Sequence, residues 1–343
     1  MPSMTMPPDH RGQGARTVEA LFKTKPLPPP PSTTFAGQTA IITGSNQGLG
    51  LRCSEIMLEH HLNHLIMAVR SIDKGEKAAS LLRKAHPSAK IDVWALDMLS
   101  YESVQSFAQR VEQLHRLDVA ILNAGYWEMG SWHIEPSTGH ETTVQVNYIS
   151  TALLAILLLP VMKRSSQASQ RPGRLSIISS GLAMAAKFEN ANEAPLLPSF
   201  DRMGAFSVGA GQERYSTTKA MVCMLVYKLS QFITADEVIV NAVDPGFTKG
   251  TALLRGAKGL MKIGVAAANA TARTIDQGTW CYIDGIVTKG KESHGSYLTN
   301  WRVNSFPSLM YTPKGKQTTE RLWEETLQEL DFAGVRSVMK SLN

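Results

Sequence analysis

From residue 38 onward, the sequence alternates between short apolar segments rich in β-branched residues and longer segments with helical spacing. Strands that alternate with helices form right-handed βαβ units, whose parallel sheet is covered by helices on both faces. The pattern therefore predicts an α/β fold, a Rossmann-type doubly wound parallel sheet of about seven strands flanked by helices. The expected strands cover residues 39–43, 65–69, 91–96, 119–122, 175–179 and 238–244, and the expected helices cover residues 51–61, 74–85, 101–114, 139–162 and 216–234.

Two segments flank this alternating region. Residues 1–36 form a proline-rich arm that includes the run Pro28 to Pro31, and such a segment buries little apolar surface. We expect the arm to be mobile or to lie over the domain in extended form, with a short helix possible at residues 17–23. Residues 37–300 are the expected catalytic domain, and residues 301–343 are an expected helical tail that contains Leu322, Leu327 and Leu330.

Charge and cysteine content exclude several classes of function. The net charge of +6 is spread along the chain rather than gathered into a basic run with aromatics, which speaks against nucleic-acid binding. Three cysteines without C-x-x-C spacing predict neither a disulfide framework nor a metal site. The longest apolar stretch, residues 152–162, is too short to span a bilayer, and no secretory signal is visible. We therefore expect a soluble, cytoplasmic protein without a membrane span.

The turn after the first expected strand is rich in glycine. Gly44, Gly48 and Gly50 give the spacing G-x-x-x-G-x-G, which lets the backbone turn tightly and approach a pyrophosphate at a helix N-terminus. At the end of the second strand stands Arg70, where an NAD-binding fold usually carries an acidic residue. A guanidinium suits a 2′-phosphate, so the sequence favours NADP(H) over NAD(H). The competing interpretation is an exposed loop arginine, and Arg52 and Lys74 either join the phosphate site or are solvated.

Tyr215 and Lys219 are separated by one helical turn and share a helix face. A lysine cation beside a tyrosine favours the phenolate and lowers the pKa of the phenol toward a useful range. By itself, this spacing of a tyrosine and a lysine is weak evidence for a catalytic pair. It lies between an Ile-Ile-Ser-Ser strand end and an Asp-Pro-Gly strand end, which strengthens the prediction of a proton-transfer pair.

Together with Asp97, Asn123-Ala124-Gly125, Asn147, Ser180 and Pro245-Gly246, these residues resemble the short-chain dehydrogenase/reductase family over residues 36–300. The resemblance implies that Tyr215 exchanges a proton with a carbonyl oxygen, that Ser180 hydrogen-bonds this oxygen, and that Lys219 binds the nicotinamide ribose. It further implies that Asn147 holds a proton-relay water, Asp97 binds the adenine amino group, and Asn123 supports the central strands. The implied catalytic residues are Asn147, Ser180, Tyr215 and Lys219, and the implied cofactor-binding residues are Gly44, Asn46, Gln47, Gly48, Leu49, Arg70, Asp97, Asn123, Ala124, Gly125, Tyr215, Lys219, Pro245, Gly246 and Thr248.

Three of these assignments have simpler competitors. Asn147 could be a helix-interior residue with a local bond, and Asp97 could be the N-cap of the following helix. Ser179 rivals Ser180, but alternation along a strand points the two side chains to opposite faces, so only one faces the site.

The chain departs from the family pattern between Ser180 and Tyr215, where residues 181–214 form a long insert. The insert and the stretch from Ala68 to Glu76 resemble the retinol-dehydrogenase-like branch. We expect the insert either to shape the substrate pocket or to decorate the surface. Apolar residues within 247–272, where the family binds substrate, favour a hydrophobic substrate, although core packing explains them equally well.

The leading hypothesis is NADP(H)-dependent interconversion of a carbonyl and a secondary alcohol on a small hydrophobic molecule. The arm and the tail resemble fungal secondary-metabolite reductases, which implies a substrate such as a polyketide. The alternative is a non-redox isomerase, dehydratase or cyclase that uses Tyr215 for proton transfer. A nucleotide-sensing binding module is disfavoured because the Tyr/Lys/Ser set is retained. The apolar helices at 151–162 and 219–232 resemble the pair that forms dimer contacts in the family, so a homodimer is possible; burial within a monomer explains them nearly as well.

Overall fold

The computed structural model describes residues 2–128, 131–202, 207–251 and 271–342. Within these ranges, eight strands form one sheet in the order β3-β2-β1-β4-β5-β6-β7-β8. The strands are β1 (Thr39–Thr43), β2 (His64–Val69), β3 (Lys90–Ala95), β4 (Val119–Leu122), β5 (Gly173–Ile178), β6 (Val238–Val243), β7 (Ser296–Thr299) and β8 (Arg302–Asn304). Neighbouring strands pair in parallel except β7 and β8, which are antiparallel. The predicted α/β class with its parallel sheet is confirmed, and β8 extends the sheet at one edge.

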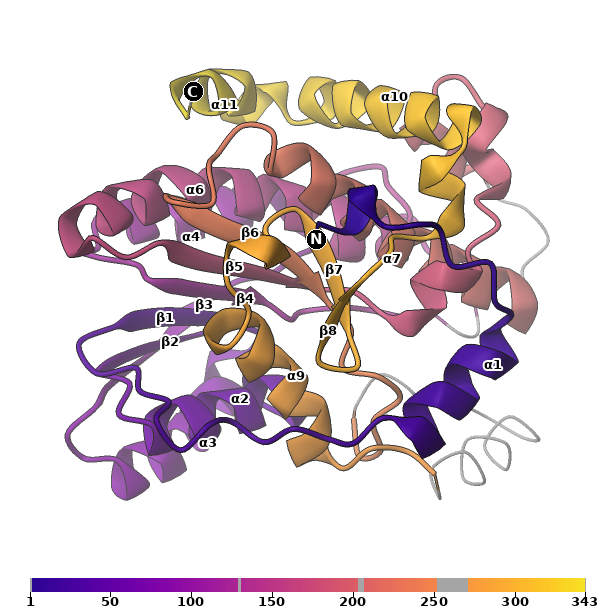
Figure 1. Cartoon of the computed structure of the whole chain (residues 1–343). Coiled ribbons are helices and arrows are strands. Elements are labelled where there is room, and N and C mark those ends of the chain that lie inside the picture. Colours follow the sequence, from indigo (N-terminus) through magenta and orange to yellow (C-terminus); the bar gives the residue numbers. More distant parts are fainter. Residues whose placement is uncertain (1, 129–130, 203–206, 252–270, 343) are drawn as a thin grey trace.

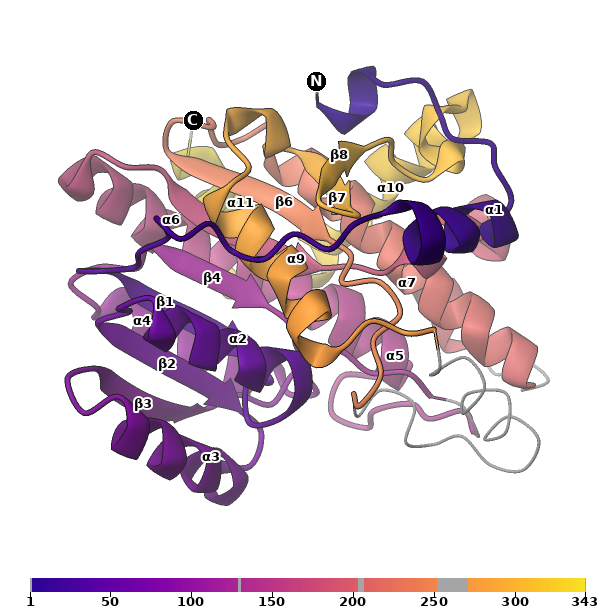
Figure 2. The same ribbon diagram turned by 60° about the horizontal axis from the view of Figure 1, so that its bottom comes forward.

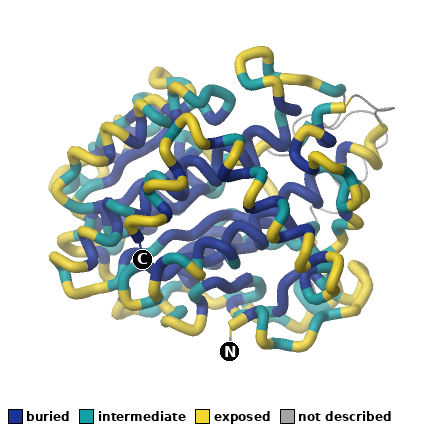
Figure 3. The backbone as a smooth tube through the Cα atoms, turned by 90° about the horizontal axis from the view of Figure 1, so that it is seen from above, coloured by how far each residue is buried: buried dark blue, intermediate teal, exposed yellow. Residues whose placement is uncertain are grey.

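Helices cover both faces of the sheet (Figure 1). One face carries α2 (Gly48–Glu59), α3 (Ile72–Ala85) and α9 (Ile275–Val287), and the other carries α4 (Tyr101–Glu112), α6 (Ser150–Ser169) and α7 (Val208–Leu229). Each layer buries its own apolar cluster against the sheet. Figure 3 shows the buried backbone at the centre of the molecule and the exposed backbone in the peripheral loops.

The order of strands changes direction between β1 and β4. From β1 the chain moves outward through β2 to β3, and it then returns to the other side of β1 to form β4. In an open α/β sheet, ligands bind at the carboxyl ends of the strands at such a switch point. The glycine-rich turn after β1 and the Asn123-Ala124-Gly125 turn after β4 meet at this point.

One long helical run differs from its predicted bounds of 139–162. It begins with α5 (Thr142–Val144), because the Glu141 side chain caps Thr143 and Val144, and it continues through the π-helical turn η3 (Gln145–Ile149) into α6. Pro160 lies inside α6 without ending it, because burial of its neighbours outweighs the local cost of proline. Residues 142–169 are long and apolar enough to cross a membrane by length and composition alone, but 89% of their most apolar window is buried inside the protein.

The C-terminal segment covers α6 and α7. Helix α10 (Pro313–Glu329) buries Trp323, which packs on Phe232 after α7, and α11 (Val335–Ser341) packs on α6. Figure 1 shows both helices lying along this side of the molecule. The structure thus accounts for the apolar surfaces of α6 and α7 by burial within the monomer, the second of the two explanations considered for them.

The insert between β5 and α7 is also packed onto this side. It holds three short 3-10 helices, η4 (Gly181–Ala185), η5 (Glu189–Asn192) and η6 (Leu197–Asp201). Phe188 and Phe200 are buried in the main core, and the Glu325 carboxylate of α10 accepts from the backbone N–H groups of Leu196 and Leu197. Helix α7 begins earlier than its predicted start at residue 216, because Ser207 caps its first turn. Phe206 of the insert lies outside the described residues.

The first residues of the arm lie against the opposite end of the chain. Its elements are η1 (Ser3–Thr5), α1 (Gln13–Val18) and the π-helical turn η2 (Glu19–Lys23). The helix expected at residues 17–23 thus begins at residue 13, with α1 and η2 forming one continuous helical run. Three further short 3-10 helices lie near the C-terminus: η8 (Lys291–Ser293), η9 (Ser308–Tyr311) and η10 (Asp331–Ala333).

Candidate active site

The glycine-rich turn joins β1 to α2 at the centre of the sheet. Gly44 and Gly48 have φ values of 65° and 59°, in the left-handed region that favours glycine. A Cβ atom at Gly50 would lie 2.7 Å from the Asn123 Nδ2 atom, so α2 can approach the neighbouring turn only without a side chain there. Gln47, the N-cap residue of α2, makes no side-chain hydrogen bond to the helix. The first backbone N–H groups of α2 are therefore available to an anion.

Arg70 directly follows β2 and is exposed at the edge of the cavity described below, which Lys74 also lines. Among the residues that the structure describes, no carboxylate pairs with the Arg70 guanidinium. Arg52, the other cation considered for a phosphate site, instead bonds Asp276 at 2.5 Å and Glu59 at 2.8 Å. The pair with Asp276 ties α2 to α9, and the pair with Glu59 lies within α2, so Arg52 is engaged away from the two cations at the cavity.

Asp97 follows β3 and lines the same cavity. Its Oδ1 atom accepts from the Leu99 N–H group at 3.0 Å. The N-cap of α4 is Ser100, whose hydroxyl accepts from the Ser103 N–H group at 3.1 Å. The simpler interpretation of Asp97 as the cap of the following helix does not hold, because Ser100 fills that position.

Asn123 forms hydrogen bonds to the elements on both sides of the switch point. Its Nδ2 group donates to the Thr43 carbonyl at the end of β1 at 2.8 Å, and its Oδ1 atom accepts from the Tyr282 hydroxyl of α9 at 2.8 Å. The neighbouring Ala124 N–H group donates to the Thr43 hydroxyl at 2.8 Å. These bonds join β1, β4 and α9 where the glycine turn begins.

Tyr215 and Lys219 lie on α7 and are each 4% exposed. The Lys219 ammonium donates to the carbonyl of Ile178, the last residue of β5, at 2.8 Å and lies 5.7 Å from the centre of the Tyr215 ring. Burial lowers the pKa of Lys219 to about 8. Burial also raises the pKa of Tyr215, while a hydrogen bond with Ser180 acts to lower it. Burial therefore moves the two pKa values apart, because it disfavours the charged form of each group and favours the neutral phenol and the neutral amine.

The two serines after β5 have different partners. The Ser179 hydroxyl is buried and donates to the Lys219 carbonyl of α7 at 2.9 Å. Ser180 is only partly buried, caps η4 by accepting from the Leu182 N–H group at 3.2 Å, and hydrogen-bonds Tyr215. The geometry thus places Ser180 beside the phenol and commits Ser179 to the backbone of α7.

Asn147 lies in the π-helical turn η3 and is 1% exposed. Its Oδ1 atom accepts from the Tyr126 N–H group at 2.8 Å, and its Nδ2 group donates to the Tyr126 carbonyl at 2.8 Å and to the Thr218 hydroxyl at 3.1 Å. These partners are distant in sequence, so the interpretation of Asn147 as a residue with a local helix bond does not hold. The side chain clamps the loop after β4 against α7, and π-helical turns of this kind are frequent at functional sites.

The Asp244-Pro245-Gly246 turn follows β6. Gly246 has a φ of 72°, and its N–H group donates to the Asp244 carboxylate at 2.9 Å. Arg273 donates to the Pro245 carbonyl at 2.9 Å, and a Cβ atom at Gly246 would lie 2.5 Å from its guanidinium. The other Asp244 oxygen accepts from the Thr299 hydroxyl of β7 at 2.9 Å. The turn is therefore held from three sides.

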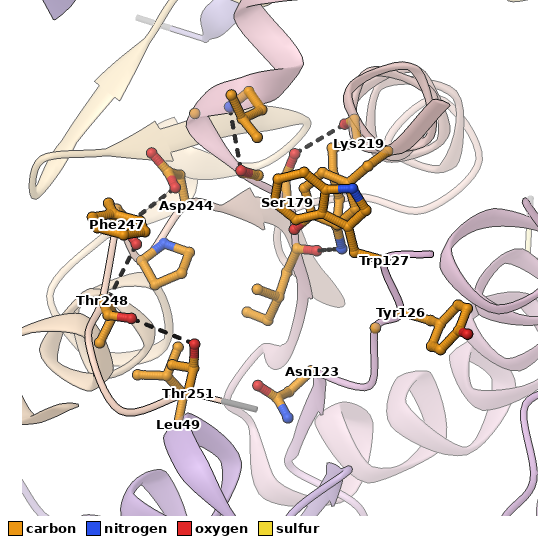
Figure 4. Close-up of a pocket in the computed structure, with 18 of the residues that line it drawn as sticks. Leu49, Asn123, Tyr126, Trp127, Ser179, Lys219, Asp244, Phe247, Thr248 and Thr251 are labelled. Atoms are coloured by element: carbon orange, nitrogen blue, oxygen red, sulfur yellow. Dashed lines mark hydrogen bonds between the residues drawn. The ribbon is translucent and has the colours of Figure 1, made fainter. Parts of the chain in front are cut away.

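These elements surround one cavity of about 1820 Å³ at the carboxyl ends of the strands. Figure 4 shows Asn123, Asp244 and Lys219 around this open space, each from a different element. Every predicted site residue lines the cavity except Asn147, which lies behind its wall. In the described ranges, no group of three or more His, Cys, Asp or Glu side chains is arranged to hold a metal ion, and all three cysteines are buried and free.

Sequence reasoning missed several residues of this cavity. Trp127 stacks on Tyr215, and Asp244 and Arg273 fix the turn after β6. Asp244 had a usable signal, since it is the one charged residue in the otherwise uncharged run 238–244 and comes at the end of that strand. Trp127 and Arg273 lie in irregular segments that carry no periodic pattern. The predicted substrate-binding segment at 247–272 lies mostly outside the described residues.

Comparison with known proteins points to one family. The family model for short chain dehydrogenases matches residues 38–192. The chain is 48% identical to short chain dehydrogenase/reductase mfmJ of Annulohypoxylon moriforme, over 94% of this chain and 92% of the relative. It is 42% identical to short chain dehydrogenase virL of Hypocrea virens, over 96% of each. Both relatives are fungal proteins.

Solved structures share the fold at lower identity. A short-chain dehydrogenase from Sphingobium yanoikuyae in complex with NADPH matches 72% of this chain and 84% of its own, with a TM-score of 0.55 and 20% identity. The bulky-bulky ketone specific alcohol dehydrogenase from Comamonas testosteroni matches 89% of this chain and 95% of its own, with a TM-score of 0.55 and 19% identity. At these identities the likeness concerns the fold alone.

Proposed function

The chain belongs to the short-chain dehydrogenase family, and from that membership we propose that it interconverts a carbonyl and a secondary alcohol with NADP(H). The observation that carries the proposal is the convergence of Tyr215, Ser180 and Lys219 in the cavity that the glycine turn and Arg70 also line. A hydride-transfer enzyme needs a proton-transfer group and a dinucleotide cradle in the same cavity.

The residues present fit a phosphorylated dinucleotide. Gly50 allows α2 to approach the turn after β4, and the first N–H groups of α2 suit a pyrophosphate. Arg70 and Lys74 offer positive charge where a 2′-phosphate would lie, and Asp97 lines the same region. Several solved relatives of the fold are described as NADP or NADPH complexes, which agrees with this choice. When bound, the dinucleotide supplies hydride for reduction and accepts it for oxidation.

Tyr215 is the proton donor in reduction and the acceptor in oxidation. Its phenol exchanges a proton with the oxygen of the reacting carbonyl or alcohol, while Ser180 donates a hydrogen bond to the same oxygen and stabilises developing negative charge. Because burial raises the pKa of Tyr215, the phenol stays protonated at neutral pH in the free enzyme and is ready to donate.

Lys219 adjusts the charge around the phenol and holds the ribose of the cofactor. Its pKa of about 8 keeps most of the amine protonated at neutral pH, and the cation stabilises the phenolate that is left after proton donation. Asn147 fixes the loop after β4 and α7 relative to each other, and in this role it holds the surroundings of Lys219. We also propose that Asn147 holds a proton-relay water, as the family resemblance implies.

The substrate end of the cavity is rich in apolar surface. Val208 is 53% exposed and Phe247 is 42% exposed, and both line the cavity with Trp127 and Met184. Exposed apolar side chains that gather in a cavity mark a binding surface for an apolar ligand. We therefore include a hydrophobic substrate in the proposal, with a fungal secondary metabolite such as a polyketide as the class. A cytoplasmic location and a homodimer remain parts of the same proposal.

The proposal is tested by following NADPH absorbance in a stopped-flow instrument while a panel of aromatic and aliphatic ketones is mixed with enzyme and NADPH. The expected result is consumption of NADPH in step with alcohol formation, and slower consumption with NADH. Product formation from a candidate substrate without any change in NADPH would overturn the redox function and support the isomerase, dehydratase or cyclase alternative.

A further inference from the structure

The N-terminal arm forms part of the wall of the active-site cavity. The arm precedes β1 and contributes no strand to the sheet, yet its middle section lines the cavity that Tyr215 and Ser180 also line. Figure 2 shows the arm crossing in front of α9 and ending at α1 and η1. The polar arm residues of the lining are Asp9, Arg11, Gln13, Arg16, Thr17 and Glu19.

Both ends of the arm are tied to the domain. Ser3 is fully buried; its N–H group donates to the Ser296 hydroxyl at 3.0 Å, and its own hydroxyl accepts from the Tyr297 N–H group at 2.8 Å. The Tyr311 hydroxyl donates to the Ser3 carbonyl at 2.6 Å. At the other end, Phe35 is buried and its N–H group donates to the His60 carbonyl at 2.8 Å. The segment between these anchors is therefore held near the cavity.

Helix α1 of the arm lies at the substrate end of the cavity. The Arg16 guanidinium donates to the Met184 carbonyl of η4 at 3.3 Å, and η4 starts directly after Ser180. The same guanidinium donates to the Asp9 carboxylate at 3.2 Å and to the Asp9 carbonyl at 3.0 Å. Arg16 thus fastens the arm to a segment that begins beside the proposed oxygen-binding serine. The glycine turn, which suits the pyrophosphate, belongs to a different strand end.

The arm contributes polarity without net charge. Arg11 pairs with Asp9 and Glu19 at 2.8 Å each, and Arg16 pairs with Asp9, so the two cations offset the two anions. Gln13 adds an uncharged hydrogen-bonding group to the same wall. A carboxylate brought to this wall would meet acidic and basic groups alike, and a purely apolar group would leave their polar atoms without water. An uncharged oxygen, such as a hydroxyl, fits best.

We propose that the arm is a specificity-determining wall that hydrogen-bonds an uncharged oxygen function at the end of the substrate remote from the reacting carbonyl. The apolar body of the substrate then lies along Trp127, Val208 and Phe247. This inference rests on the proposed carbonyl–alcohol function and adds the substrate class: a flat or elongated apolar molecule with a carbonyl at one end and a hydroxyl or second carbonyl at the other.

Three matched ketones test the wall: 4-acetylbiphenyl, its 4′-hydroxy derivative and its 4′-carboxy derivative, each reduced by the full-length enzyme with NADPH. The hydroxy ketone is expected to have a kcat/KM about fivefold above the parent, as one hydrogen bond provides, and the carboxylate is expected to fall below both. Arg16→Ala loses the bond to Met184. In this variant the preference for the hydroxy ketone should disappear, while kcat/KM for the parent ketone should change by less than about twofold.

Lys23→Ala is the matched control, because Lys23 is an exposed cation of the same arm outside the cavity lining. It should keep the preference of the wild type. A second variant, deletion of residues 2–24, removes the wall and should also abolish the preference. NADPH affinity, followed by tryptophan fluorescence, should stay unchanged in Arg16→Ala. The proposed role of the arm would be wrong if Arg16→Ala lowered kcat/KM equally for all three ketones, or if the wild type reduced the three ketones with equal kcat/KM.

Failure of the proposed function has a different signature. If the wild type reduces none of the three ketones, their dissociation constants from the enzyme with NADP⁺ are measured by the same fluorescence signal. The order of affinity should again be hydroxy ketone, parent and carboxylate, with Arg16→Ala removing the difference between the first two. Identical dissociation constants of the three ketones in the wild type would then contradict the proposed role of the arm, whether or not the enzyme reduces ketones.

Discussion

The indole ring of Trp127 lies nearly parallel to the phenol ring of Tyr215, with the ring centres 4.7 Å apart and 14° between the planes. The stack covers one face of the proposed proton donor and leaves its hydroxyl beside Ser180. The loop that carries Trp127 is fixed because Asn147 bonds both the N–H and the carbonyl group of the preceding Tyr126. Figure 4 shows Trp127 beside the open part of the cavity. Trp127 therefore packs the loop after β4 against the proposed proton donor of α7, inside the cavity that both residues line.

Replacement of Trp127 tests this relationship. Trp127→Ala should lower kcat/KM for aromatic ketones about tenfold, since a stacked pair contributes about 1 kcal/mol beyond the apolar area it buries. Because burial raises the pKa of Tyr215, exposing the phenol should also move the alkaline limb of the pH–rate profile to lower pH. Trp127→Phe keeps an aromatic face and should retain most of the activity. An unchanged profile in Trp127→Ala would mean that the stack plays no part in catalysis.

Tyr215→Phe removes the proposed proton donor while keeping its ring. Turnover should fall by a factor of about 10² to 10⁴, the usual contribution of general acid–base catalysis. NADPH affinity should remain nearly the same, because the stack with Trp127 and the packing of α7 persist. Steady-state rates and fluorescence titration measure the two effects. Turnover at the wild-type rate would show that another group transfers the proton.

Ser180 and Ser179 form a matched pair of neighbours for a second test. Ser180→Ala removes the proposed hydrogen bond to the reacting oxygen and should lower kcat about a hundredfold with little change in stability. Ser179→Ala breaks a buried bond to the Lys219 carbonyl, so it should cost about 1 kcal/mol of unfolding free energy and change kcat less. Kinetics and urea unfolding of both variants separate the roles, and the reverse pattern would reassign them.

Local sequence signals were sufficient for the centre of the fold. The strands at Thr39–Thr43 and Val119–Leu122 have the predicted bounds, because each is a short apolar run that ends at a glycine turn or an Asn-Ala-Gly turn. Membership of the predicted family and its fungal relatives is confirmed. The retinol-dehydrogenase-like branch and the division into three segments remain predictions.

Features that depend on distant contacts were not accessible in this way. Pro160 stays helical because α6 is buried between the sheet and α11, which no local propensity encodes. Composition left open whether the arm is mobile or lies over the domain, because Ser3 is held on the domain by partners about three hundred residues away. Trp127 lies in a segment without a helical or strand pattern, and its stack on Tyr215 depends on where two separate elements meet. Spacing and the family resemblance identified candidate residues that line the cavity, such as Ser180, Tyr215 and Lys219, but not Trp127 beside them.

Arg70 should determine the choice between the two dinucleotides. Arg70→Asp should weaken NADPH binding by a factor of about 10 to 100, because it replaces charge-assisted bonds to a phosphate with repulsion, while NADH binding changes little. Arg52→Ala is the control, since Arg52 pairs with Asp276 outside the cavity lining and should leave the ratio of the two affinities unchanged. Fluorescence titration with both dinucleotides measures this ratio. A ratio unaffected by Arg70→Asp would remove the 2′-phosphate contact from the proposal.

A buried ion cluster fastens the C-terminal helix α10 to the body of the protein. The His140 imidazole lies 2.9 Å from the Asp201 carboxylate of η6 and 3.1 Å from the Glu329 carboxylate at the end of α10. Burial alone would lower the pKa of His140, but the hydrogen bonds to Asp201 and Glu329 outweigh it and raise the pKa to about 9. Tyr101 of α4 also donates to Glu329, at 3.0 Å, so the cluster joins four separate segments.

The raised pKa makes stability depend on pH in a defined window. Because His140 binds its proton more tightly in the folded state, its contribution is fully present below the unfolded pKa of 6.5 and is lost as pH rises toward about 9. A shift of this size corresponds to at most ~3 kcal/mol. The free energies of unfolding of the wild type and His140→Asn, measured in urea, should therefore differ most at pH ~6 and least at pH ~9.5, apart from a constant difference in packing. His133→Asn, at an exposed position, should show no such convergence. A difference between wild type and His140→Asn that stays constant across the window would mean that the cluster holds α10 through packing rather than through charge.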